Sequence, residues 1–312
     1  MKWRILFIGI GSIAKRHIKN LREICVENCI EITIDALRRN RKFVDIEECK
    51  ISNIYTKFEE LTGVYDVVFI TNPTELHIDT LIKAMPYGKH FFIEKPISSI
   101  NQIDIAEKIK LNPNSVFYVA CPLRYNAVIQ YLKNIINTNQ VLYVRSISSS
   151  YLPDWRPTMD YRETYSAHKN LGGGVSIDLI HEWDYLNYLF GSPKNVVYLG
   201  GKNSKLEIDS DDYADYLAEY DNKIISLHLD YFGRYSIREI MLITQDETIV
   251  ADILNNKIRF LKSNKKFDFG EERDDYQKRE LLHFINIVLK NRENDSTISH
   301  AIKILKLTQG VL

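Results

Sequence analysis

Three side chains carry the functional groups that proton transfer to or from a hydroxyl requires. They are the amine of Lys95, the carboxylate of Asp178 and the imidazole of His181. Histidine has an ordinary pKa near ~6.5, so it can take or give a proton close to neutral pH. An ammonium group can stabilise negative charge that develops on an oxygen. We therefore treat these three residues as candidate catalytic groups.

Lys95 stands in the tripeptide Glu94-Lys95-Pro96, directly after the apolar segment 90–93. Proline fixes its own φ and disfavours the helical conformation at the residue before it, so an extended segment is expected at Lys95. Because this segment follows a buried strand, it can project the lysine inward. The alternative is an ordinary polar strand end.

Asp178 and His181 lie three residues apart in the segment 174–190, which has the apolar spacing of a helix. The pattern places both on one side of this helix, away from its apolar stripe. The glycines at 172–174 allow the backbone to approach a ligand closely before the helix begins. A solvated polar face is the alternative, and a structural role is expected for Asp184. The stripe consists of Leu179, Trp183, Leu186 and Phe190.

An apolar segment at residues 3–8 runs directly into a glycine-rich turn, and a helical pattern follows at once. This spacing is typical of the turn that presents the N-terminus of a helix to a pyrophosphate. Gly9 permits the tight turn, Gly11 leaves room for the phosphates, and Ala14 lets the helix pack on the strand. Backbone N–H groups at the helix start point at the anion. Candidate cofactor-binding residues here are Gly9, Gly11, Ser12, Ile13 and Ala14.

The end of the second predicted strand bears on which dinucleotide binds. In this fold an acidic residue near the strand end usually bonds the hydroxyls of the adenosine ribose. Arg38 and Arg39 occupy the positions just past the strand, and arginine suits a 2′-phosphate and stacks on adenine. We therefore favour NADP over NAD. In the alternative, Asp35 is the ribose acid and the arginines are solvated.

Further polar residues follow predicted strands at the carboxyl edge of the sheet, where ligands bind in this fold. His77 is placed to approach the nicotinamide ribose, with a capping or surface histidine as the alternative. The other candidate cofactor contacts at this edge are Thr71, Asn72, Pro73, Glu94 and Lys95.

Two patterns along the chain predict the elements that position these residues. Residues 1–122 alternate between strand-like and helix-like segments, which predicts a doubly wound parallel sheet of the Rossmann type. After residue 140, strand-like segments with short polar links predict a mostly antiparallel sheet. In the first region, strands are expected at 3–8, 31–37, 66–71, 90–93 and 116–120, and helices at 13–25, 74–85 and 100–111. In the second, a helix at 174–190 precedes strands at 196–200, 213–220, 224–231, 237–244, 248–254 and 258–261, a loop at 262–275, and helices at 276–290 and 299–307.

The fold class is therefore α/β, with a Rossmann domain at 1–122 and an α+β domain with a large, mostly antiparallel sheet at 123–312. The 312 residues include 41 basic and 41 acidic ones, and this zero net charge argues against a nucleic-acid partner. The four cysteines form no disulfide framework at this chain length, so we expect a reduced, cytoplasmic protein. Cys25 and Cys29 lie four residues apart and could share one helix face, but no histidine or further cysteine lies near them at ligand spacing, so we expect no metal. No apolar run approaches the ~20 residues of a membrane span.

Three motifs occur in order along nearly the whole chain: Gly9-x-Gly11-x-x-Ala14, Glu94-Lys95-Pro96, and the stretch from Gly172 through Asp178 and His181 to Asp184. Together they resemble the Gfo/Idh/MocA family of NAD(P)-dependent oxidoreductases. The resemblance implies catalytic roles for Lys95, Asp178 and His181, and a homodimer or homotetramer formed through the C-terminal sheet. Many members have three residues between the aspartate and the histidine, whereas this chain has two. If the helix is shifted, Asp178 is a positioning residue and His181 the only titrating group.

The stretch 151–166, just before the glycine run, is dense in aromatic and charged residues. Its rings can stack on a sugar, and its guanidinium groups can hold a carboxylate or phosphate. The alternative is an ordered loop packed by its own aromatics. Several nearby arginines favour an acidic sugar or a sugar nucleotide. Candidate substrate contacts are Arg124, Tyr125, Trp155, Arg156, Tyr161 and Arg162, with Lys95, Asp178 and His181.

The leading functional hypothesis is hydride transfer between nicotinamide and a secondary alcohol or ketone of a sugar, sugar acid or sugar nucleotide. His181 takes the hydroxyl proton, Lys95 stabilises the alkoxide, and Asp178 orients the imidazole or bonds the sugar. One alternative is an NAD-dependent glycoside hydrolase that oxidises and re-reduces one sugar carbon. Another is a non-catalytic NAD(P)-binding sensor or scaffold.

Overall fold

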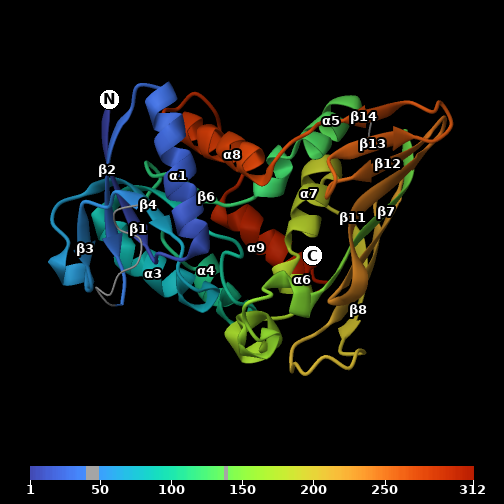
Figure 1. Ribbon diagram of the computed structural model, residues 1–312, viewed down its shortest axis with the longest axis horizontal. Coiled ribbons are helices and arrows are strands. Elements are labelled where there is room, and N and C mark those ends of the chain that lie inside the picture. Colours follow the sequence, from blue (N-terminus) through green and yellow to red (C-terminus); the bar gives the residue numbers. More distant parts are fainter. Residues whose placement is uncertain (40–48, 137–139) are drawn as a thin grey trace. The chain divides into compact units, whose positions relative to one another are not determined.

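Six parallel strands form the first sheet, in the order β3-β2-β1-β4-β5-β6. Strands β1 to β4 and β6 of this sheet are labelled in Figure 1. The structure, a computed structural model, describes residues 1–39, 49–136 and 140–312. Most side chains of β1 and β4 and the last three of β5 are buried, as in a parallel sheet packed between helices. The strands are β1 (Lys2–Ile8), β2 (Glu31–Leu37), β3 (Asn53–Tyr55), β4 (Tyr65–Ile70), β5 (Gly88–Ile93) and β6 (Phe117–Val119).

The five strands predicted in this region are confirmed, with ends shifted by at most about two residues. Strand β3 was not predicted, because it has only three residues and none of them is buried. The helices here are α1 (Ser12–Glu27), α3 (His77–Ala84) and α4 (Ile103–Glu107). Helix α4 is much shorter than the segment 100–111 that the sequence pattern suggested.

By their contacts, the described residues divide into a first unit, 1–122 with 273–302, and a second unit, 123–272 with 303–312. Helix α8 (Arg273–Val288), which was expected in the second domain, groups with the first unit. Its Phe284 packs against the rings of Phe92 and Tyr118, with centroid distances of 5.3 and 5.6 Å. This aromatic contact explains why α8 packs with the N-terminal sheet.

The second unit is built on an eight-stranded sheet in the order β14-β13-β12-β11-β7-β10-β9-β8. Neighbouring strands are antiparallel except for β7 and β10, which run parallel. The six predicted strands are confirmed, whereas central β7 and short β14 were not predicted. Strand β7 was not recognised in the sequence because serines interrupt its apolar pattern. The strands are β7 (Val141–Tyr151), β8 (Asn195–Gly201), β9 (Tyr213–Glu219), β10 (Ile224–Asp230), β11 (Phe232–Thr244), β12 (Thr248–Asp252), β13 (Lys257–Phe260) and β14 (Lys266–Asp268).

Helix α7 (His181–Phe190) packs on one face of this sheet. The Trp183 ring meets Tyr216 of β9 edge-on at 5.2 Å, and the Tyr185 hydroxyl lies 3.2 Å from Oγ of Ser146 on β7.

The single helix predicted over 174–190 is wrong. Leu179, at φ −95° and ψ 28°, leaves helical geometry and separates α6 (Val175–Asp178) from α7. The remaining helices are α5 (Ala127–Ile135) and α9 (Ile298–Leu307), and none of the described helices has the length and apolarity needed to cross a bilayer.

The other face of this sheet is exposed and mixes apolar and charged side chains. Val197 of β8 is paired with Leu217 of β9, and both side chains are exposed. On β10, His228 lies between two aspartates, with Nδ1 2.8 Å from Asp215 and Nε2 3.0 Å from Asp230. This outer face therefore carries both exposed apolar side chains and charged side chains that pair with one another.

The docking of α8 can be tested by removing the Phe284 ring. Truncation of a buried aromatic side chain leaves a cavity, so Phe284→Ala is expected to lower the free energy of unfolding by about 3–5 kcal/mol. Urea denaturation measures this change. The matched control is Leu282→Ala on the same helix, because Leu282 is 38% exposed. Equal losses in both variants would contradict the packing described.

The outer face contains a second testable feature, the charge of His228. The hydrogen bond to Asp230, with that to Asp215, outweighs burial and raises the pKa of His228 from 6.5 to about 8. Its stabilising contribution is therefore complete below pH 6.5 and is lost as the pH rises through 8. His228→Gln should lower the free energy of unfolding more at about pH 6 than at about pH 9, as measured by urea denaturation. An identical loss at both pH values would argue against this pairing.

Candidate active site

The turn after β1 leaves the start of α1 accessible. Gly9 has a φ of +88°, and a Cβ there would lie 2.8 Å from the Cα of Asn72, so glycine is required. Gly11 caps the helix without a side-chain hydrogen bond, and the first turn contains no acidic residue. A Cβ on Gly11 would meet no atom of the described chain within 4 Å. Of the remaining turn residues, Ser12 is exposed, Ile13 half-buried and Ala14 fully buried.

These features fit a pyrophosphate. The first backbone N–H groups of a helix have no partner within the helix, and the helix dipole favours an anion beside them. Among the described residues, no side chain caps this helix end, and the first turn of the helix contains no acidic residue. The residues present therefore suit the phosphates of a dinucleotide.

The charged residues near the end of β2 separate into buried and accessible groups. Asp35 is buried, and its carboxylate accepts hydrogen bonds from the Tyr65 hydroxyl and from Nδ2 of Asn53, both at 2.9 Å. Burial, followed by this bond to Asp35, raises the pKa of Tyr65. Arg38 is half-buried and Arg39 exposed directly past the strand. The alternative that makes Asp35 the ribose acid therefore loses support.

The residues after β4 hold in place the turn at residues 9–11, which is the predicted phosphate turn. Thr71 is buried, and its hydroxyl donates to the carbonyl oxygen of Gly9 at 2.7 Å. Asn72 donates from Nδ2 to the hydroxyl of Thr80 at 2.7 Å. Pro73 is exposed. Thr71 and Asn72 thus shape the backbone on which a cofactor would lie.

His77 does not occupy the exposed position that a ribose contact needs. It is 1% exposed, its Nδ1 lies 2.8 Å from the carbonyl oxygen of Pro96, and its Nε2 lies 2.9 Å from that of Asn72. Burial lowers the pKa of His77 although both contacts favour its charged form. His77 joins the loops after β4 and β5, so we correct its predicted role from a cofactor contact to a structural link.

Glu94 and Lys95 follow β5 as the sequence indicates. The Glu94 carboxylate accepts a hydrogen bond from Nε2 of His17 at 2.5 Å, and Lys95 is half-buried beside it in the chain. Burial alone would raise the pKa of Glu94, but the hydrogen bond from His17 and the charges of His17 and Lys95 bring it below its ordinary value. Glu94 is therefore an ionised carboxylate next to the candidate catalytic lysine.

The glycine run before α6 contacts protein backbone. A Cβ on Gly173 would lie 2.1 Å from the carbonyl oxygen of Tyr165 and 2.8 Å from that of His168. The absent side chain makes room for the backbone of residues 165–168, and the approach to a ligand suggested by the sequence is not what requires this glycine. The run thereby fixes the segment 165–168 against the start of α6.

Asp178 and His181 end one helix and begin the next. Asp178 is buried, and its carboxylate accepts a hydrogen bond from the Tyr231 hydroxyl at 2.5 Å. Tyr165 also hydrogen-bonds to it, and burial followed by the charge of Asp178 raises the pKa of Tyr165. His181 is half-buried at the first position of α7. The spacing of three residues is retained, but across a break rather than along one helix.

The predicted substrate residue Arg124 is engaged inside the second unit. It is 2% exposed and forms a two-point ion pair with Asp184, at 2.8 and 2.6 Å. Its guanidinium also lies 5.6 Å from the ring centre of Tyr188. Arg124 is therefore corrected to a structural residue, and Asp184 takes the structural role expected of it. The neighbouring Tyr125 is half-buried.

The segment 151–166 is an ordered loop with both aromatic and ionic contacts. Trp155 meets the Tyr231 ring edge-on at 5.2 Å, and Arg156 lies 5.6 Å from the ring centre of Tyr165. Both residues thus contact the tyrosines that hold Asp178.

The other two predicted residues of this loop are engaged elsewhere. The Tyr161 hydroxyl accepts from the backbone N–H of Glu207 at 3.2 Å. Arg162 pairs with Asp160 and with Glu207, each at 2.6 Å. Two carboxylates neutralise Arg162, so we correct its predicted role as an anion contact.

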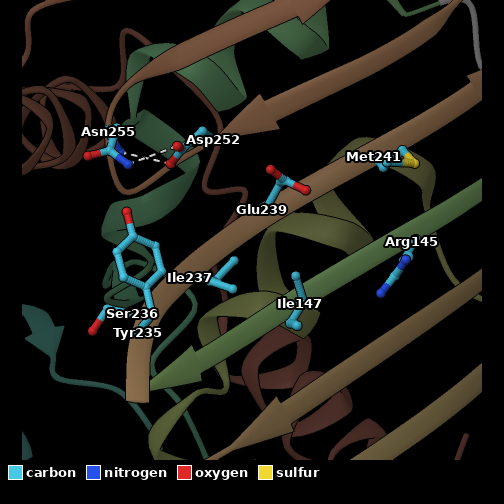
Figure 2. A pocket seen from close by; sticks show the side chains of 9 residues that line it. All are labelled: Arg145, Ile147, Tyr235, Ser236, Ile237, Glu239, Met241, Asp252 and Asn255. Atoms are coloured by element: carbon cyan, nitrogen blue, oxygen red, sulfur yellow. Dashed lines mark hydrogen bonds between the residues drawn. The ribbon is translucent and has the colours of Figure 1, made fainter. Parts of the chain in front are cut away.

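A hollow of about 290 Å³ lies on the outer face of the second sheet (Figure 2). Arg145, Glu239 and Asp252 contribute charged groups, and Ile147, Ile237 and Met241 are apolar. None of the predicted substrate residues lines it. The hollow is therefore a feature of the exposed face, and neither Asp178 nor His181 lines it.

Sequence reasoning missed His17, Tyr165 and Tyr231. Tyr231 closed a predicted strand and looked like an ordinary core residue, and His17 lay within a helix pattern. Their partners are 53 and 77 residues away in the chain for Tyr231 and His17, respectively. No local spacing signals such contacts.

Comparisons with known proteins identify the family to which this chain belongs. Residues 3–112 match the model of an oxidoreductase family with an NAD-binding Rossmann fold, and residues 129–244 match the Gfo/Idh/MocA C-terminal domain. The uncharacterised oxidoreductase YrbE of Bacillus subtilis is 25% identical over 198 residues, covering 62% of this chain and 55% of that protein. Myo-inositol 2-dehydrogenase of Thermotoga maritima is 24% identical over 203 residues, covering 64% and 58%.

The chain thus spans little more than half the length of these curated relatives. A levoglucosan dehydrogenase solved in complex with NADH shares the fold, with a TM-score of 0.85 and 14% identity over 100% of this chain and 96% of that one. The predicted fold class is confirmed. With both of its domain models matched in order, this chain belongs to the Gfo/Idh/MocA family of oxidoreductases and has the family's NAD-binding Rossmann fold.

Proposed function

We propose that this protein is an NAD(P)-dependent dehydrogenase or reductase that acts on a secondary alcohol or ketone of a carbohydrate. The observation that carries this proposal is the uncapped N-terminus of α1 behind Gly9 and Gly11. It follows the central strand of a parallel sheet whose strand order is typical of dinucleotide binding. Family membership and the dehydrogenases among the relatives support the same activity.

In this proposal the bound nicotinamide supplies or accepts the hydride. His181 takes the hydroxyl proton during oxidation and returns it during reduction. Lys95 donates a hydrogen bond to the oxygen on which negative charge develops. Asp178 orients His181 or bonds the sugar, while Tyr231 holds its carboxylate in one position.

The carbohydrate class is supported by the names of the relatives, which include a myo-inositol and a levoglucosan dehydrogenase. Trp155 offers an accessible ring, as it is 37% exposed. Among the three predicted arginines, Arg156 is the one whose described contact is an aromatic ring and not a carboxylate. We therefore assign to Arg156 the recognition of an acidic sugar or a sugar nucleotide.

A second copy of the chain is the proposed protein partner. The outer face of the second sheet exposes apolar side chains on several adjacent strands, and exposed apolar surface of this extent marks interaction sites. Its exposed apolar residues include Val197, Leu199, Leu217, Ile224, Ile237 and Ile243. We propose that a homodimer or homotetramer forms through this face.

Kinetics test the catalytic assignments. NAD(P)H absorbance is followed with a panel of polyols, sugar acids and nucleotide sugars. Lys95→Ala and His181→Asn are each expected to lower kcat by roughly 10²–10⁴-fold, because each removes a group that acts on the reacting oxygen or its proton. Calorimetry with NADH checks that the cofactor still binds.

Lys83→Ala on α3 is the matched control, because Lys83 is exposed and its loss should leave turnover unchanged. Unchanged turnover in Lys95→Ala would remove that residue from the mechanism. Sugar cleavage without net NAD(P)H formation would favour the hydrolase alternative, and nucleotide binding without any turnover would favour the sensor.

Arg38 gives a separate test of cofactor choice. Arg38→Ala should weaken NADPH binding by roughly ten- to a hundredfold, because it loses a charged hydrogen bond to the 2′-phosphate. NADH binding should change much less, since NADH lacks that phosphate. Calorimetry with both cofactors measures the difference. Equal losses for the two would contradict NADP recognition by this arginine.

A further inference from the structure

Two buried histidines hold the residues on either side of Lys95. On one side, Nε2 of His17 lies 2.5 Å from the Glu94 carboxylate. On the other, Nδ1 of His77 lies 2.8 Å from the carbonyl oxygen of Pro96. Both histidines are 1% exposed, and they come from different helices, α1 and α3. The tripeptide that carries Lys95 is therefore fixed at both ends by groups of the first unit.

His17 is held rigidly in an aromatic environment. Its ring meets Phe92 edge-on at 5.1 Å and lies 6.1 Å from the ring of Phe69. Its Nδ1 has no hydrogen-bond partner in the described part of the chain. A buried polar pair in such surroundings is weak evidence for stability, because an apolar pair of similar volume is often as stable. The pairing with Glu94 therefore calls for a functional reason.

Glu94 supplies that reason through its charge. The titratable groups that act on it are His17 from α1, His77 from α3 and Lys95 from its own segment. Burial raises its pKa, but the hydrogen bond from His17 and these charges together lower it, so Glu94 is ionised at neutral pH. The attraction is mutual: the Glu94 carboxylate, which is 13% exposed, favours the ammonium form of the adjacent Lys95.

We propose that His17 is a positioning residue which fixes Glu94 as a carboxylate beside Lys95 and thereby keeps Lys95 protonated. His17 lies on α1, three residues after Ala14. It therefore also links the segment that carries Lys95 to the helix that begins at the phosphate turn. Binding of a dinucleotide at the start of α1 and the charge of Lys95 thus depend on one helix. The proposal rests on the role assigned to Lys95 in the proposed function.

The pH dependence of Lys95 acylation tests this directly and does not require a substrate. The full-length protein and its variants are treated with an amine-acylating reagent over a range of pH, and modification of the Lys95 peptide is followed by mass spectrometry. His17→Leu removes the donor and keeps an apolar side chain, whereas His17→Gln retains an N–H donor. Glu94→Gln removes the charge. Lys83 in the same samples is the internal control.

In His17→Leu and Glu94→Gln, the midpoint of Lys95 modification should fall by about one pH unit, which is a roughly tenfold faster reaction below the transition. His17→Gln should remain close to the wild type, and Lys83 should not shift in any sample. An unchanged Lys95 midpoint in both His17→Leu and Glu94→Gln overturns the proposal. If His17→Leu does not fold, as judged by circular dichroism, an unchanged midpoint in Glu94→Gln still overturns the proposal, because His17 acts on Lys95 only through the Glu94 carboxylate.

The same samples separate this proposal from the proposed function. Calorimetry of the wild type with NADH and NADPH reports whether a dinucleotide binds. Absence of binding would refute the dehydrogenase assignment, while the acylation midpoints would still show whether His17 controls the charge of Lys95.

Discussion

Helix α1 begins without a side-chain cap among the described residues, and the segment after β4 packs against the turn that precedes this helix end. Gly11 offers no side-chain acceptor, and the first turn carries no carboxylate to offset the helix dipole. The Thr71 hydroxyl holds the carbonyl of Gly9 in place. Further along the same helix, His17 engages the residue that precedes Lys95. One helix therefore both offers an anion site and fixes the neighbourhood of the candidate catalytic lysine.

The polar residues Arg124, Arg162 and Asp178 of the second unit fall into two groups, according to the kind of side chain that binds them. Arg124 and Arg162 pair with carboxylates, which neutralises them and removes them from anion binding. Asp178 is held instead by tyrosine hydroxyls, which donate hydrogen bonds without adding a positive charge. The hydrogen bond from Tyr231 thus fixes the Asp178 carboxylate at the end of α6. Ion pairs and tyrosine hydroxyls are therefore two different ways in which this unit fixes its polar side chains.

Backbone packing explains a motif that side-chain chemistry alone does not. Because Gly173 has no side chain, carbonyl oxygens of the segment 165–168 can pack against it. The glycine run thereby fixes the loop that carries Tyr165. Tyr165 in turn bonds to Asp178 at the end of α6. The break at Leu179 then allows His181 to start a new helix. Glycines, loop and helix break together set the geometry of the Asp178 region.

The sequence by itself determined the parallel sheet, the phosphate turn and the order of the three motifs, because each depends on residues close together in the chain. Apolar runs specify buried strands, and Gly9 and Gly11 act within a single turn. The pairing of Asp35 with Tyr65, of Arg124 with Asp184, and of His17 with Glu94 was decided only by the tertiary structure. Whether a charged side chain faces a ligand or a partner within the protein depends on residues distant in sequence, and no local pattern encodes that contact.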